Sequence, residues 1–165
     1  MPFQINNLSA SFARPNNTTA YASGQLVANA TAAGAVVPMQ IPLGNLAAVG
    51  HGITRITRAR LSKSGPSAAN ASFRIHLYQA APTAANGDGG AWSTDNAANW
   101  LGNIDITSML AFTDGCTGTG SATAGSEMFL RLASGALFAL VEARAAYAPA
   151  ANEVFTLTLE DVGQW

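Results

Sequence analysis

Residues 52–78, GITRITRARLSKSGPSAANASFRIHLY, decide the fold that we expect for this chain. In the second half of the stretch, Phe73, Ile75 and Leu77 alternate with Arg74 and His76. Successive side chains of a β-strand point to opposite faces of a sheet, so this alternation indicates a strand with one buried face. A Gly-Pro pair in the middle is typical of a turn. The stretch therefore predicts two long strands, joined as a β-hairpin at the centre of a β-sandwich.

The first arm of this hairpin does not keep one parity. Ile53, Ala59 and Leu61 share a face in an ideal strand, whereas Ile56 falls on the other face. A β-bulge changes the face of the residues beyond it, because it inserts one extra residue into a strand. We therefore expect a bulge near residues 54–55 that turns Ile56 toward the core.

The rest of the chain reads as short strands separated by turn signals. About nine strands are expected in all, with almost no amphipathic helix. A short helix is predicted at residues 96–100, and a two-residue hairpin turn at residues 134–135. Residues 81–95 and 113–126 are predicted as long Gly-rich loops. The pattern predicts an all-β protein, an antiparallel β-sandwich of the jelly-roll type, with residues 1–165 as one domain.

Composition excludes several classes of partner. Charged residues make up 10% of the 165 residues, and the formal net charge is −1. We therefore expect no long-range attraction to nucleic acid or to an anionic membrane. No apolar run approaches the roughly 20 residues of a membrane helix, and the first 15 residues lack the basic and apolar segments of a secretory signal. A surface with so few charges can lie against another protein without burying unpaired ions.

Residues with catalytic or metal-binding chemistry are scattered. The two histidines, His51 and His76, have no partners at metal-ligand spacing, and the only cysteine, Cys116, has no histidine near it in sequence. The loop at residues 86–89, NGDG, lacks the spacing and final glutamate of a calcium loop, so a turn is the simpler interpretation, although ion binding at residues 86–90 stays open. We expect no enzyme activity, no metal and no cofactor.

Arginine and tryptophan are the more informative side chains. Four of the seven arginines lie in residues 52–78, where arginine forks can pair with carboxylates of a protein partner. Tryptophan is enriched where proteins anchor to each other, and two tryptophans flank the first long loop while a third ends the chain. The candidate protein-interface residues are therefore Arg55, Arg58, Arg60, Arg74, His76, Trp92, Trp100 and Trp165. Within this set, Arg58, Arg60, Arg74 and His76 are expected to form a single face.

Five stretches carry a resemblance to a known family: residues 21–29 (YASGQLVAN), 56–65 (ITRARLSKSG), 71–78 (ASFRIHLY), 86–95 (NGDGGAWSTD) and 143–147 (ARAAY). They resemble segments of small structural proteins encoded in the head-gene region of tailed bacteriophages and prophages. The resemblance implies a capsid decoration, or cement, protein of the jelly-roll type. Such a protein would bind the outer surface of the virion shell after synthesis in the bacterial cytoplasm, and it has no catalytic residues.

The resemblance also implies partners. These are the major capsid protein and further copies of the chain, as a dimer or trimer at capsid symmetry axes, so that neighbouring capsomers are bridged. Two alternatives remain from the residues themselves. One is a carbohydrate- or receptor-binding module of a tail fibre or tailspike, with Trp92 and Trp100 stacking on sugar rings. The other is a small jelly-roll enzyme, which would need His51 and His76 to meet in space.

Overall fold

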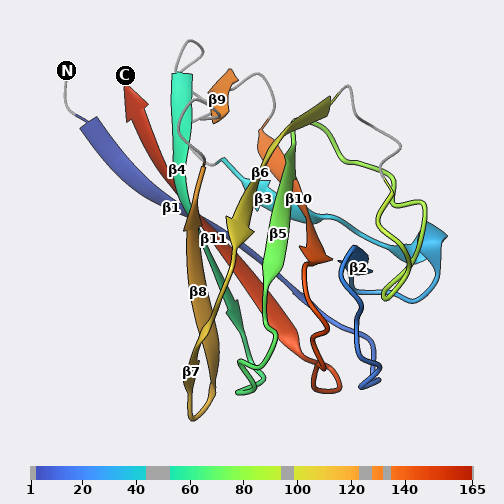
Figure 1. Ribbon diagram of the computed structural model, residues 1–165. Coiled ribbons are helices and arrows are strands. Elements are labelled where there is room, and N and C mark those ends of the chain that lie inside the picture. The colour runs from blue at the N-terminus through green and yellow to red at the C-terminus, as the bar shows by residue number, and fades with distance from the viewer. Residues whose placement is uncertain (1–2, 44–52, 94–98, 123–127, 132–134, 165) are drawn as a thin grey trace.

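A computed structural model describes residues 3–43, 53–93, 99–122, 128–131 and 135–164. Within these residues the chain forms strands and one short 3₁₀ turn, and no helix there is long and apolar enough to cross a membrane. The elements are β1 (Phe3–Ala13), β2 (Gln25–Val27), η1 (Ala33–Ala35), β3 (Met39–Pro42), β4 (Ile53–Lys63), β5 (Phe73–Tyr78), β6 (Trp100–Ile106), β7 (Leu110–Phe112), β8 (Gly115–Ser121), β9 (Met128–Arg131), β10 (Ala136–Ala143) and β11 (Val154–Gln164) (Figure 1).

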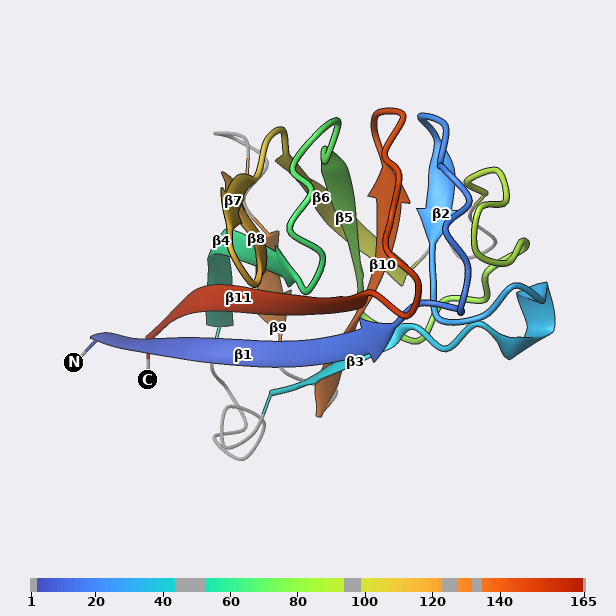
Figure 2. The same ribbon diagram turned by 90° about the horizontal axis from the view of Figure 1, so that it is seen from below.

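The strands form two antiparallel sheets that pack as a sandwich. Sheet A has the order β1-β11-β4-β8-β7, with β9 also pairing β4. Sheet B has the order β2-β10-β5-β6, with β3 also pairing β10. Figure 2 shows β1 and β11 in one layer and β2, β5 and β10 in the other. The chain passes repeatedly between the sheets, and its first and last strands pair. This is the strand order of a jelly roll, so the predicted fold class is confirmed.

The predicted hairpin, however, is wrong. β4 pairs with β11, β8 and β9 in sheet A, whereas β5 pairs with β10 and β6 in sheet B. Residues 64–72 connect the two strands across the sandwich rather than through a tight turn. Similarly, β9 joins sheet A and β10 joins sheet B, so the strands around residues 134–135 do not form a hairpin with each other. The alternation of side chains along a segment identifies a strand, but contacts with residues distant in sequence determine which strands pair with it.

The bulge in β4 lies later than predicted. Arg58 pairs with Glu160 and Ile56 with Asp161, which makes Thr57 the extra residue. The hydroxyl of Thr57 donates a hydrogen bond to the carbonyl of Glu160 at 3.1 Å. Ile56 is fully buried, as predicted. Ile56 and Ala59 are three residues apart and would point to opposite faces of a regular strand, yet both are buried. The bulge must therefore lie between them, which explains why Thr57 is the extra residue.

The second predicted Gly-rich loop contains strand β8. Gly118 and Gly120 lie on the inner face of β8, where the sandwich is narrow. A Cβ atom on Gly120 would lie 2.1 Å from the carbonyl oxygen of Asp105, and one on Gly118 would lie 2.6 Å from the carbonyl oxygen of Ser108. The glycines therefore allow β8 to pack closely against β6 and the segment that follows it, and their frequency reflects packing rather than a flexible loop.

The core lies between the sheets, and sheet B is also covered on its other side. Phe73, Ile75 and Leu77 face the core, as predicted. On the opposite face of sheet B, Tyr78 and Leu140 belong to a second apolar cluster, which residues of the segment after β5 cover. Residues 81–93 therefore protect part of sheet B from water. The predicted short helix falls mostly outside the described residues, and Trp100 begins β6.

Two buried ion pairs lie side by side where loops of both sheets meet. Arg14 donates to Asp88 at 2.8 Å, and Lys63 donates to Glu153 at 3.2 Å, with every side chain of the two pairs at most 3% exposed. The two pairs adjoin because the backbone N–H of Arg14 donates to the carbonyl of Glu153 at 2.9 Å. Tyr21 completes the first cluster through hydrogen bonds with Asp88 and Arg14.

The carboxylate of Asp88 is fully engaged in this arrangement. It accepts hydrogen bonds from the Tyr21 hydroxyl at 2.5 Å and from the backbone N–H of Ala28 at 2.9 Å, in addition to the Arg14 ion pair. Ion binding at residues 86–90 stayed open from the sequence. In the structure, the carboxylate of Asp88 in this loop instead attaches the loop to the body of the sandwich.

We expect Gly120→Ala to lower the free energy of unfolding by at least about 2 kcal/mol, because the added methyl group has no space between β8 and β6. Chemical denaturation monitored by tryptophan fluorescence measures this change. Gly34→Ala is the matched control, since a Cβ there meets nothing within 4 Å. An equal effect of the two substitutions would contradict the proposed close packing.

Candidate functional site: two opposite sheet faces

The candidate interface residues lie on two opposite faces of the sandwich. Arg55, Arg58 and Arg60 lie on β4 in sheet A, whereas Arg74 and His76 lie on β5 in sheet B. The expectation of a single face built from residues of both strands is therefore wrong, because β4 and β5 are not partners. Trp92 and Trp100 lie on the sheet B side, and Trp165 lies outside the described residues.

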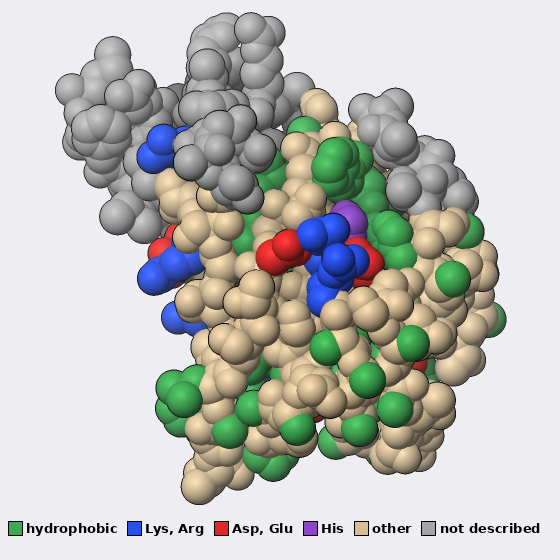
Figure 3. Space-filling model, in the orientation of Figure 1, with side chains coloured by type: hydrophobic (Ala, Val, Ile, Leu, Met, Phe, Trp, Pro, Cys, Tyr) green, Lys and Arg blue, Asp and Glu red, His purple; other side chains and the backbone are tan. Residues whose placement is uncertain are grey.

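The outer face of sheet B carries a cluster of alternating charges. Arg74 faces Asp105 on one neighbouring strand and Glu142 on the other. Its guanidinium donates to both carboxylate oxygens of Asp105, at 2.6 and 2.7 Å. Arg144 donates to Glu142 at 2.8 Å. The ion pair with Arg74 holds the pKa of Asp105 below its usual range. Figure 3 shows these charges gathered around the histidine in the middle of a largely uncharged face.

His76 is buried within this cluster, although the alternation predicted an exposed position. Its side chain is 9% exposed, because the ring stacks on Trp92 with centroids 3.9 Å apart. Nε2 lies 2.8 Å from a carboxylate oxygen of Glu142. Burial lowers the pKa of His76, since it disfavours the charged imidazolium more than Glu142 favours it. His76 and Trp92 therefore hold the covering segment onto sheet B.

Trp100 is the aromatic residue that this face offers to a partner. It begins β6 opposite Tyr78, and 44% of its surface is exposed. Its ring centroid lies 6.4 Å from that of His76. The neighbouring rings of His76 and Trp92 are themselves packed together, so Trp100 projects from a rigid base. Such a pre-ordered aromatic side chain is well suited to anchor a contact.

The outer face of sheet A combines arginines with hydroxyl side chains. Arg58 donates to both carboxylate oxygens of Glu160, at 2.9 and 2.6 Å, whereas Arg55 and Arg60 are exposed, and no ion pair of theirs is found among the described residues. Register places hydroxyl residues beside them in rows across four strands, for example Ser9, Thr158, Arg60 and Thr119. The other hydroxyl residues of this face are Ser11, Ser62, Thr117, Ser121 and Thr156. We call this surface the arginine–hydroxyl face.

Sequence reasoning found the arginines of this face but missed the hydroxyl rows. Thr117 and Thr119 were placed in a loop because glycines surround them. The signal was nevertheless present in both β8 and β11, where threonine recurs at every second position. Period-two threonines in a strand mark a polar outer face.

Groups that could perform chemistry are kept apart. Cys116 is buried on the inner side of β8 in sheet A, whereas His76 lies on the outer side of sheet B, so the two do not form a catalytic pair. His51 lies outside the described residues. No group of three or more His, Cys, Asp or Glu side chains that could hold a metal ion occurs in the described ranges.

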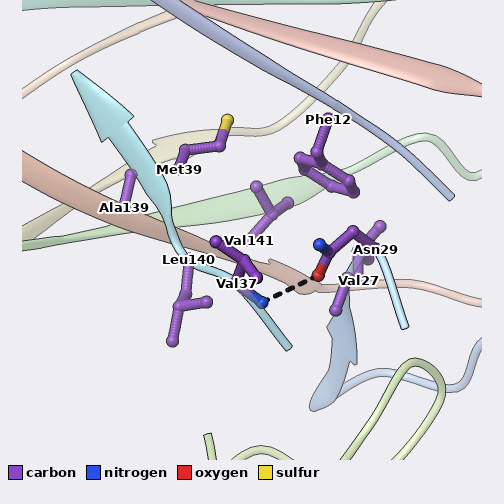
Figure 4. Close-up of a pocket in the computed structure, with 9 residues that line it drawn as sticks. Phe12, Val27, Asn29, Val37, Met39, Ala139, Leu140 and Val141 are labelled. Carbon is purple, nitrogen blue, oxygen red and sulfur yellow. Dashed lines mark hydrogen bonds between the residues drawn. The ribbon is translucent and has the colours of Figure 1, made fainter. Parts of the chain in front are cut away.

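A small hollow lies between β1, β2, β3 and β10, lined mainly by apolar side chains (Figure 4). The amide oxygen of Asn29 accepts a hydrogen bond there from the backbone N–H of Val37 at 3.0 Å. The volume of the hollow is about 10 Å³, which is near the lower limit for one water molecule. It therefore has no room for an organic ligand.

Comparison with known proteins identifies no family. No protein-family model matches the chain, and no curated protein matches it either. Among solved structures, a virus-like particle of the extra small virus of the giant freshwater prawn Macrobrachium rosenbergii is similar at 8% identity and a TM-score of 0.32, covering 98% of this chain and 78% of that one. The decameric BFDV capsid protein is similar at 11% identity and a TM-score of 0.40, covering 99% and 100%. Scores at this level do not establish a role.

We expect the stability of the protein to fall as the pH drops from about 7 to about 5, in part because of His76. The pKa of His76 is lowered in the folded state, so the unfolded chain binds the proton more readily below its ordinary pKa of about 6.5. His76→Gln, which retains a polar group opposite Glu142, should reduce this loss. Thermal unfolding of both proteins across this pH range measures the difference. Curves that remain parallel would rule out a contribution from His76.

Proposed function

We propose that this chain is a non-enzymatic virion structural protein, which decorates and stabilises the capsid of a tailed bacteriophage. The observation that carries the proposal is the pair of opposite faces on one sandwich. The arginine–hydroxyl face and the Trp100 face both present interface-type side chains on strands. A protein that bridges neighbouring units of a shell needs two such surfaces. The family resemblance of residues 56–65 and 71–78, which contribute to the two faces, supports the same role.

The arginine–hydroxyl face is proposed to meet the major capsid protein. Arg55 and Arg60 are exposed and can form charge-assisted, two-pronged hydrogen bonds with carboxylates on the shell. The hydroxyl groups around them can exchange hydrogen bonds with a protein surface without adding charge. Neither feature needs a cavity or a cofactor. Each contact would be modest, and many copies on a repeating outer surface would hold firmly through avidity.

The second face is proposed to act between neighbouring units of the assembly. Trp100 stands on a rigid base beside the charge cluster of Arg74, Asp105 and Glu142. Its exposed ring offers apolar area at low entropic cost, because the side chain has two rotatable bonds. The same exposed ring is the one observation that favours the alternative, a carbohydrate- or receptor-binding module of a tail fibre or tailspike, since sugar rings stack on tryptophan.

Glycan binding and copy number separate the two functions. We expect many copies per virion of a protein that covers a repeating shell, and few copies of a tail component. If a glycan array detects binding that Trp100→Ala abolishes, the tail module is the better description. Trp100 is the residue to test, because Trp92 is partly covered by its stack with His76.

We expect Arg60→Glu, and more strongly Arg55→Glu with Arg60→Glu, to reduce binding to undecorated capsids by about tenfold or more, because each places a carboxylate where an arginine should meet one. The free energy of unfolding should change little, since both side chains are exposed. Co-sedimentation with capsids lacking the protein measures binding, and thermal unfolding measures stability.

Ala20→Glu combined with Val37→Glu is the matched control, since it also lowers the net charge by two, at exposed positions outside the strands of both faces. Equal loss of binding with Arg60→Glu and with this double variant would show that overall charge, not the arginine–hydroxyl face, governs the contact. A large fall in melting temperature with Arg60→Glu would instead show that this arginine supports the fold.

A further inference from the structure

Strand β7 forms an open edge of sheet A and is unusually apolar for an exposed strand. All three of its residues are exposed, with Leu110 at 66% and Phe112 at 53%. Its neighbour on one side is β8, and no strand of the described chain pairs with its other side. The β7–β8 hairpin extends to the bottom of the molecule in Figure 1, where no other element covers it.

Edge strands usually carry features that prevent pairing with another chain. Lysine, proline, a bulge or a covering loop are the common devices. β7 has the sequence Leu-Ala-Phe and contains none of these residues. Its shortness limits the number of backbone hydrogen bonds, but its side chains favour pairing. We propose that β7 is a self-association edge, which pairs antiparallel with β7 of a second copy of this chain.

The side-chain pattern of β7 is complementary to itself. In an antiparallel pair centred on Ala111, Leu110 of each copy lies directly opposite Phe112 of the other. Both residues lie on the outer face of sheet A, since they pair with Thr117 and Gly115 while Ala111 pairs with the buried Cys116. Phe112 therefore has a glycine on one side, which leaves space for its ring, and a leucine of the second copy on the other.

The turn after β7 limits the pairing to the strand itself. Phe112 pairs with Gly115, so Thr113 and Asp114 form the tight turn that joins β7 to β8. Leu110, Ala111 and Phe112 carry no charge. The arrangement centred on Ala111 thus brings four large apolar side chains together and opposes no like charges.

Pairing of this kind closes on itself. The contact is two-fold symmetric, so each copy uses its only β7 edge and no further copy can add there. Sheet A then continues from one copy into the next. The dimer does not depend on the proposed virion role, because it is measured on the isolated chain, and its absence would leave the capsid-binding experiment unaffected.

Sedimentation velocity of the purified full chain tests the dimer. We expect a reversible dimer with a Kd below about 100 μM. Leu110→Lys and Phe112→Lys should each raise the Kd by about a hundredfold, since each dimer loses two apolar contacts and gains two buried charges. Val37→Lys is the matched control, because Val37 is also 66% exposed but lies outside the strands. A monomeric wild-type chain at this concentration, or a dimer that survives Leu110→Lys, would overturn the proposal.

Discussion

The adjoining ion pairs of Arg14 with Asp88 and of Lys63 with Glu153 hold the loop end of the sandwich together. Each pair joins segments that are far apart in the chain, and Tyr21 and Tyr147 extend the network between them. Removing one partner would leave a buried charge alone, which typically costs about 3–5 kcal/mol. Replacing whole pairs by apolar residues would be cheaper in energy but would lose the directional hydrogen bonds that fix loop positions. The loops at this end are therefore specified by polar contacts rather than by apolar packing.

Local sequence predicted the strands better than it predicted their partners. The alternation in Phe73, Ile75 and Leu77 identified β5 and its inward face, and the overall class followed from the number of such segments. Pairing depends on contacts between distant strands, so residues 52–78 looked like a hairpin although they span both sheets. β8 was predicted as a loop because it is rich in glycine. Gly118 and Gly120 are needed because β6 and the segment after it lie close to β8, and this closeness cannot be seen in the local sequence.

The candidate site shows the same division. Arg55, Arg60 and Trp100, which residue type selected as candidate interface residues, are exposed, and their contact with a partner stays a prediction. The alternation along β5 predicted an exposed His76, which is instead buried. The segment that covers it comes from the loop after β5, and Trp92 provides the stacking surface. Because the arginines and tryptophans divide between two sheets, the candidate interface residues form two separate faces where the sequence predicted one.

The pairing of β1 with β11 determines when this chain can fold. Residues 3–13 find their partners only in residues 154–164, almost at the other end of the chain. A ribosome must therefore synthesise residues 3–164 before β1 can pair fully with β11, and until then β1 has no strand partner in the described part of the chain. Contacts so distant in sequence slow folding, because a long loop must close before they form. In a cell that makes many copies at once, newly made chains would compete to donate β11 to one another, so folding yield should depend on the rate of synthesis.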